Sequence, residues 1–65
     1  MRYKRTLVIE RFPAEGGYNA TPADPDTHMT EVAADGWLLV NGAVTEVKNE
    51  TGTELTTHFF WERER

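Results

Sequence analysis

The sequence predicts a small α+β domain, in which a three-stranded, mostly antiparallel sheet carries one helix packed on one face, in the order β-α-β-β. Three observations predict it. Segments 2–12 and 54–64 alternate apolar and polar residues with the period of two that is typical of strands. Segment 25–35 lies between them and has helix start and stop signals. An aliphatic-rich segment, 37–47, follows that helix directly and reads as another strand.

The period of two divides the side chains of the first and last predicted strands between two faces. In the first strand, one face holds Tyr3, Leu7 and Ile9, and the other holds Val8 and Phe12. In the last strand, one face holds Leu55, Thr57, Phe59 and Trp61, and the other holds Thr56, His58, Phe60 and Glu62. The centre of the last strand is apolar on both faces, so this strand is expected at the centre of the sheet or at a subunit interface.

Residues 13–23 are rich in Gly, Pro, Asn and Ala and are predicted to form a loop after Pro13 ends the first strand. A loop of this length is long for so small a domain, which makes it a candidate contact surface. Tyr18 is its only large side chain. Two roles stay open for it: a lid that folds back over the core, or a binding residue.

The helix at 25–35 is predicted from the residues at its two ends. Asp24 is a good N-cap, and Pro25 suits the first helical position, where no N–H is needed. Gly36 is expected in the left-handed conformation that ends many helices. Trp37 then begins the next strand and packs back onto the helix. The expected apolar stripe of the helix consists of Met29, Val32 and Ala33.

The strand at 37–47 contains a break at Asn41-Gly42, which is compatible with a tight turn or with a bulge. A turn would leave flanking runs of only four or five residues, so we predict a bulge in one longer strand. The polar segment 48–53 is predicted to be a hairpin loop, with Gly52 available for a positive φ.

One helix cannot cover both faces of the sheet, so one face is expected to stay open, with Val8, Phe12 and Phe60 near it. A chain of 65 residues also buries little surface, and it contains no cysteine for a disulfide or a cysteine-rich zinc site. An exposed apolar patch on a small protein usually marks an interface. The sequence therefore predicts a homo-oligomer, with a dimer as the favoured form.

The net charge of −4 argues against a duplex nucleic acid partner, which requires a concentrated basic face. Single-strand binding through Arg5, Arg11 and the aromatic residues remains a third hypothesis, because aromatics on a sheet can stack on bases. No apolar run approaches a membrane span, and "TLVI" is too short for a signal sequence, so a cytoplasmic location without membrane contact is expected.

The sequence offers little for catalysis. It contains no serine and no cysteine, so the common hydroxyl and thiol nucleophiles are missing. His58 could act as a general base if a strand glutamate faced it, but it is more simply a polar residue on a strand face. His28 is expected at the helix surface, and its spacing from His58 does not support a metal triad. We therefore expect no catalytic residue, no metal site and no cofactor.

Three stretches resemble a family of small uncharacterised bacterial and phage proteins with a strand, helix, Gly-Trp-x-Leu-Val strand and closing strand. They are "RYKRTLVIE", "MTEVAADGWLLVNG" and "THFFWERER". The family core is matched by Gly36, Trp37, Leu39 and Val40, whereas Leu38 stands where the family has an acidic residue. The resemblance covers most of the chain apart from 13–23. It implies the fold, a bacterial or phage origin and no assigned chemistry.

The function expected from these observations is that of a non-enzymatic interaction module that self-associates and binds a protein partner, either a host protein if a phage encodes the chain or another cellular protein. The alternative is an oligomeric small-ligand-binding protein with an aromatic pocket between its subunits. The binding residues expected for these two functions are Phe12, Tyr18, His58, Phe60 and Trp61.

Overall fold

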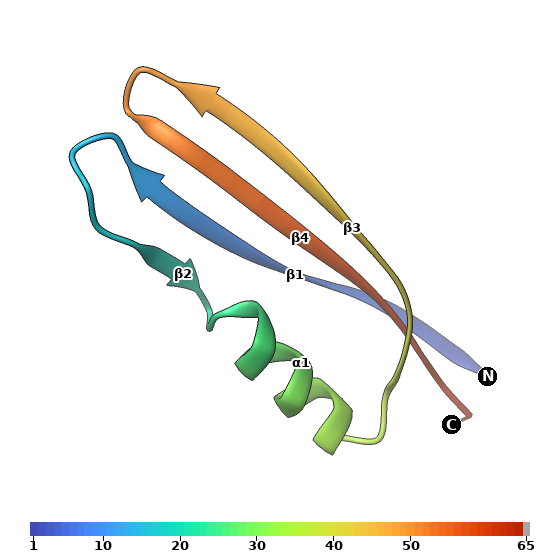
Figure 1. Cartoon of the computed structure of the whole chain (residues 1–65). Coiled ribbons are helices and arrows are strands. Elements are labelled where there is room, and N and C mark those ends of the chain that lie inside the picture. Colours follow the sequence, from blue (N-terminus) through green and yellow to red (C-terminus); the bar gives the residue numbers. More distant parts are fainter. Residues whose placement is uncertain (65) are drawn as a thin grey trace.

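A computed structural model of the chain describes residues 1–64 and shows one helix on a four-stranded antiparallel sheet (Figure 1). The elements are β1 (Arg2–Pro13), β2 (Asn19–Thr21), α1 (Pro25–Ala34), β3 (Leu38–Asn49) and β4 (Gly52–Arg63). The strands lie in the order β2-β1-β4-β3. The α+β class with a single helix is confirmed. The predicted count of three strands was wrong.

The additional strand, β2, lies inside the segment that was predicted to be a loop, 13–23. Its three residues pair with Ile9, Glu10 and Arg11 of β1. A run as short as Asn-Ala-Thr carries no alternation of apolar and polar residues. Its strand conformation comes from pairing with β1, which a local pattern cannot reveal.

The hairpin between β3 and β4 is tighter than the predicted loop at 48–53. β3 continues to Asn49, β4 begins at Gly52, and only Glu50 and Thr51 lie between the two strands. Lys48 pairs with Thr53 and thus extends the ladder with polar residues. Both faces are solvated at this end of the sheet, so the apolar alternation that reveals a half-buried strand is missing.

Gly52 is required by the close approach of β1 to this hairpin. Its φ is +143°, and a Cβ at this position would overlap the backbone oxygen of Phe12 and lie 2.8 Å from the Cα of Pro13. The predicted positive φ of Gly52 is confirmed. The predicted bulge is confirmed as well, since the register between β3 and β4 shifts between Leu39 and Asn41.

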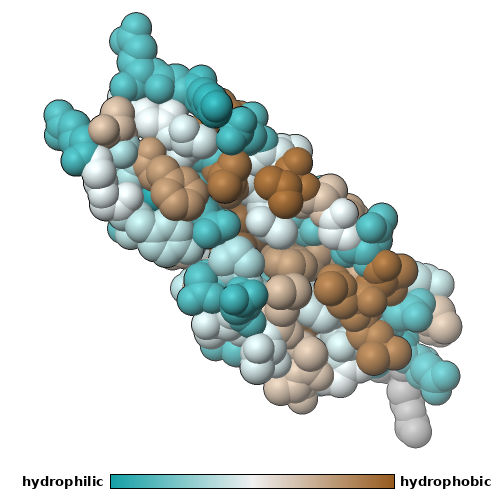
Figure 2. All heavy atoms as spheres, viewed as in Figure 1, coloured by the Kyte–Doolittle hydropathy of each residue, from teal (hydrophilic) through white to brown (hydrophobic). Residues whose placement is uncertain are grey.

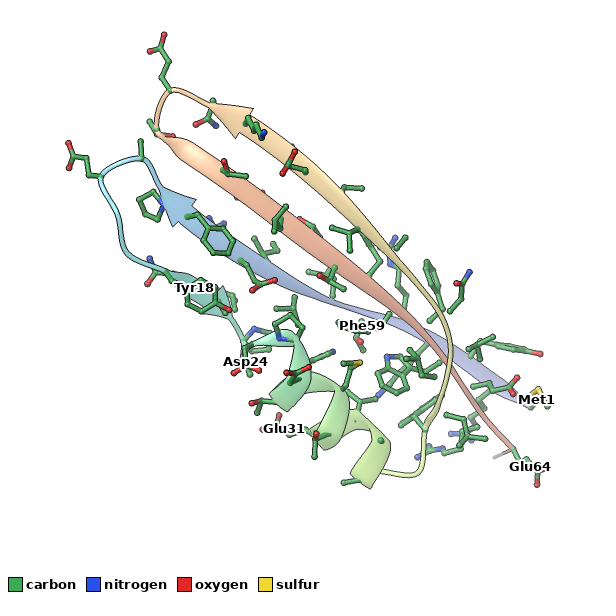
Figure 3. The ribbon with its side chains drawn as sticks, viewed as in Figure 1. Met1, Tyr18, Asp24, Glu31, Phe59 and Glu64 are labelled. Atoms are coloured by element: carbon green, nitrogen blue, oxygen red, sulfur yellow. The ribbon has the colours of Figure 1, made fainter. Side chains whose placement is uncertain are left out.

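The core lies between α1 and the half of the sheet that it covers. Val8, Trp37, Phe59 and Trp61 form it, and Met29 and Val32 of the helix pack against it. Figure 3 shows Phe59 on the side of the sheet that faces α1 and Glu31 on the outer side of the helix. Burying each side chain of this size contributes about 1.5–3 kcal/mol to folding.

The structure corrects which residues lie on the open face, meaning the face of the sheet opposite α1. Val8 is fully buried beneath the helix, and Phe12 lies on that same face of β1. Of the three residues predicted near the open face, only Phe60 lies there. Phe59 and Trp61 sit across from Thr6 and Lys4, so the even-numbered residues of β1 lie on the face that carries α1, and Val8 is the one of them in the core.

Both ends of α1 follow the prediction. The Asp24 side chain accepts a hydrogen bond from Thr27 N–H at 2.9 Å, and Gly36 has φ +92°. The buried side of the helix differs from the predicted stripe, because His28 is buried whereas Ala33 is exposed. His28 packs against Phe59 with the two rings tilted by 38° and their centroids 5.2 Å apart.

Candidate interaction surfaces

The five predicted binding residues do not form one cluster. Trp61 is in the core and is only 2% exposed. Phe12 and Tyr18 lie together beside β2, on the face of the sheet that carries α1. His58 and Phe60 lie on the open face, on alternate residues of β4. The structure therefore divides them among three places.

Trp61 is held in the core by a hydrogen-bond network that the sequence did not reveal. Its indole N–H donates to Thr6 Oγ1 at 2.8 Å, and His28 Nε2 lies 2.7 Å from the same oxygen. These three side chains come from β4, β1 and α1, so one hydroxyl ties three elements together. His28, predicted at the surface, is thus a core residue, 8% exposed.

Tyr18 packs on Phe12 rather than over the core, with ring centroids 5.2 Å apart. Its hydroxyl donates to a Glu10 carboxylate oxygen at 2.7 Å. That hydrogen bond to an anion, with the negative charge of Glu10, raises the pKa of Tyr18 to about 12. The pair fixes the loop that precedes β2 against β1.

The open face combines apolar and basic side chains. Phe60 is 38% exposed and sits across from Arg5 of β1, and the neighbouring pair on this face is Leu7 and His58. A shallow hollow of about 300 Å³ is lined by Tyr3, Lys4, Arg5, Val40, Phe60 and Trp61. The cross-strand neighbours of His58 are Leu7 and Ala43, neither of which can act as an acid or a base with it.

The two arginines of the single-strand nucleic acid hypothesis share the open face, but their surroundings differ. Arg5 lies beside Phe60. Arg11 donates through Nε to Glu54 at 3.1 Å, which offsets its charge.

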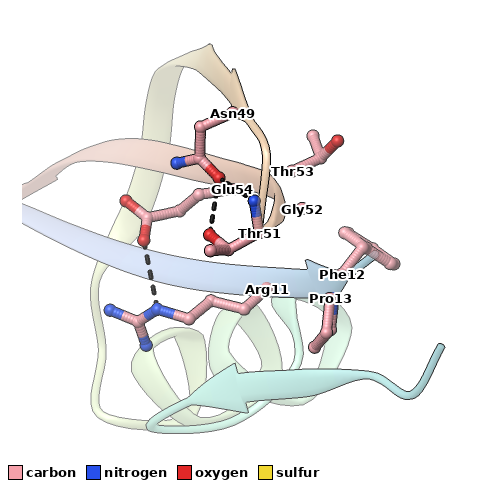
Figure 4. A pocket seen from close by; sticks show the side chains of 8 residues that line it. All are labelled: Arg11, Phe12, Pro13, Asn49, Thr51, Gly52, Thr53 and Glu54. Carbon is pink, nitrogen blue, oxygen red and sulfur yellow. Dashed lines mark hydrogen bonds and ion pairs between the residues drawn. The ribbon is translucent and has the colours of Figure 1, made fainter. Parts of the chain in front are cut away.

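A second hollow, of about 260 Å³, lies where the end of β1 meets the β3–β4 hairpin (Figure 4). Its polar groups bond to one another. The Asn49 side chain accepts from the N–H and the hydroxyl of Thr51 at 2.9 and 2.6 Å. The Arg11–Glu54 pair closes another side. These contacts brace the hairpin.

β3 exposes more apolar surface than the sequence predicted. All twelve of its residues are exposed. Among them, Leu38 is 65% exposed and Val44 is 63% exposed. Exposed apolar side chains also appear in several patches in Figure 2. The aliphatic content of 37–47 predicted a strand, but it could not show that this strand lies at an edge of the sheet.

Lys4 and Arg63 flank the buried ring of Trp37. The Lys4 ammonium and the Arg63 guanidinium each lie 4.4 Å from the ring centroid of Trp37. Such cation–π contacts contribute about 0.5–2 kcal/mol each, depending on how far they are desolvated. Lys4 and Arg5 point to opposite faces of β1, as strand geometry predicts.

Among residues 1–64, no cluster of three or more His, Cys, Asp or Glu side chains has the geometry of a metal site. In the same part of the chain, no helix has the length and apolar character needed to cross a membrane. No family model, no curated protein and no solved structure matches the chain. The family resemblance drawn from the three sequence stretches therefore rests on those motifs alone.

Proposed function

We propose that the protein is a small non-enzymatic interaction module that self-associates. It binds a protein partner through the open face of its sheet. One observation carries the proposal: α1 covers one face of the sheet and leaves aromatic and aliphatic side chains of the other face in solvent. Tyr3, Leu7, Leu38, Val47 and Phe60 are the exposed large hydrophobic residues of that face.

The composition of the open face fits a protein partner. Protein interfaces are enriched in Tyr, Phe and Arg, and apolar area ringed by polar residues is typical of their cores. Here Phe60 is the central aromatic residue, with Arg5 beside it and Tyr3 further along β1. Phe12 and Tyr18 lie on the other face and form a separate contact surface beside β2.

A second candidate function, an oligomeric small-ligand-binding protein, is favoured by the hollow of about 300 Å³ at Tyr3, Val40 and Phe60. Its volume is at the small end of the range for ligand pockets, which is about 300–1,000 Å³. Of the predicted binding residues, Phe60 and Trp61 line this hollow, whereas Tyr18 and His58 do not. The hollow is open, so a ligand would need a second wall supplied by another subunit.

Site-specific photocrosslinking in the native host cells tests the proposal. A photoreactive phenylalanine analogue replaces Phe60, and the control carries the same analogue at Glu31, on the exposed side of α1. We expect a discrete protein adduct at position 60 and none at position 31. Equal crosslinking at both positions, or none at position 60, would contradict binding through the open face. A small-molecule adduct instead would favour the ligand-binding alternative.

A further inference from the structure

The two edges of the sheet differ. At one edge, the three-residue β2 pairs with Ile9–Arg11 of β1 and is followed directly by Pro22, and the first part of β1, residues 2–8, has no strand on its outer side. β3 forms the other edge, is twelve residues long and has no strand on its outer side (Figure 1). Proteins normally shorten or interrupt an exposed edge, because its free N–H and C=O groups pair with other chains. β3 has one bulge, near Val40, and is then regular from 41 to 49.

The hairpin shows which backbone groups of β3 are free. Asn49 and Gly52 close a two-residue turn, and such a closing pair is hydrogen-bonded. Hydrogen-bonded pairs alternate with non-hydrogen-bonded pairs along an antiparallel ladder. The odd residues from 41 to 49 therefore bond to β4. The even residues direct their N–H and C=O groups outward, and they are Gly42, Val44, Glu46 and Lys48.

An observed contact agrees with this assignment. The Gly42 N–H donates to the side chain of its neighbour, Asn41, at 2.8 Å. A side-chain partner of this kind satisfies an amide that faces away from the ladder. The outward amides of Val44, Glu46 and Lys48 have no such neighbouring side-chain acceptor among the hydrogen bonds of residues 1–64.

We infer that the β3 edge pairs with the β3 edge of a second copy of this chain, antiparallel and about a two-fold axis at Thr45. This inference rests on the self-association in the proposed function and names its surface. In this register Val44 pairs with Glu46 of the second copy, and Gly42 pairs with its Lys48. All four outward residues of each copy then take part, and the ladder ends where the regular segment 41–49 ends.

The side chains suit this register. On the open face, Thr45 meets Thr45 of the second copy, and Ala43 meets its Val47; such Thr–Thr and aliphatic cross-strand pairs are favourable. On the opposite face, the charged groups of the seam are Glu46 and Lys48, which pair within one copy at 3.8 Å. Each copy thus adds one charge of each sign, and no net charge accumulates at the seam.

The strand that pairs with the β3 edge is expected to come from a second copy of this chain rather than from another protein, because such a pairing forms a closed dimer. The pair is an eight-stranded sheet in the order β2-β1-β4-β3-β3-β4-β1-β2. The two-fold pairing uses the β3 edge of both copies at once, so no β3 edge is left to bind a third copy. Both helices lie on one face, and the two open faces join into one continuous surface for the partner.

Single-cysteine variants test the pairing, because the chain has no cysteine of its own. In the proposed register the two Thr45 residues form a non-hydrogen-bonded pair, with Cα atoms about 4.5 Å apart, which a disulfide can span. Thr45→Cys should form a disulfide dimer under mild oxidation. The control is Thr56→Cys, which lies across from Thr45 on β4 but away from the edge, and should stay reduced.

A backbone variant gives an independent test. Val44→Pro removes an outward N–H without removing a bond to β4, which an edge strand tolerates. We expect its dimer dissociation constant to rise about tenfold or more, since the two-fold pair loses two hydrogen bonds. The control Val44→Ala, which removes the side chain but keeps the N–H, should still dimerise.

The outcomes separate this inference from the proposed function. If the protein dimerises but Thr56→Cys crosslinks faster than Thr45→Cys, the copies pack through their open faces and the edge pairing is wrong. A dimer that neither cysteine captures and that Val44→Pro leaves unchanged would also overturn the edge pairing, while self-association would stand. A wild-type protein that stays monomeric would overturn both.

Discussion

The indole N–H of Trp61 donates to the hydroxyl of Thr6 over 2.8 Å, although 55 residues separate them in the chain. This bond places the largest aromatic side chain of β4 on the helix-bearing face, and it thereby leaves Phe60, its neighbour, on the open face. Neighbouring residues of β4 therefore have different roles. Phe59 and Trp61 lie in the core, and Phe60 is exposed and able to contact a partner.

Thr6→Val should destabilise the fold although valine has nearly the shape of threonine. The substitution leaves the Trp61 N–H and the His28 ring nitrogen without their shared partner in the core. A buried polar group that loses its partner costs about 1–3 kcal/mol. Urea unfolding followed by tryptophan fluorescence measures this loss. Thr6→Ser keeps the hydroxyl and should cost less, and equal losses in both variants would contradict the role given to the hydroxyl.

Gly52→Ala should lower the free energy of unfolding by more than about 1 kcal/mol, because alanine is strained at positive φ and its Cβ would collide with β1. Gly42→Ala is the matched control. A Cβ there meets the backbone oxygen of His58 at 3.5 Å, an ordinary contact, and the φ of Gly42 is not positive. In thermal unfolding, the Tm of Gly52→Ala should lie well below the Tm of Gly42→Ala. The reverse order would contradict the account of the hairpin.

The phenol of Tyr18 should lose its proton at a higher pH than a free tyrosine does. The pKa of its phenol is raised from 10.0 to about 12 by the hydrogen bond to Glu10. Since the folded-state pKa lies above the unfolded-state value, the stabilisation from this bond is fully present below pH 10 and is lost as the pH rises towards 12. The difference in tyrosinate absorbance between wild type and Tyr18→Phe isolates this titration. In Glu10→Gln the pKa of Tyr18 should fall towards 10, and an unchanged value would show that Glu10 is not the cause.

The sequence predicted the elements whose signals are local. Asp24 and Gly36 bound the helix where capping rules place its ends, and the alternation in 54–64 assigned Phe59 and Phe60 to opposite faces of one strand. These features depend on neighbouring residues alone. For this reason they could be predicted without knowledge of the tertiary structure.

The features that the sequence did not reveal depend on which strands lie side by side. β2 became a strand because Ala20 meets Glu10 of β1, and His28 became a core residue because Thr6 faces it from another element. Whether Val8 faced the helix or the open side could not be decided without the position of α1. The exposure of β3 at an edge likewise follows from the strand order, which no single segment encodes.

Self-association is the central claim, and sedimentation equilibrium of the gently purified, untagged protein over a wide concentration range tests it most directly. The account predicts a reversible species with twice the 7.4 kDa mass of one chain and no larger assembly, because the two-fold pairing uses the β3 edge of both copies. A mass of one chain at every concentration would contradict the claim. Open-ended growth with concentration would contradict the closed pairing.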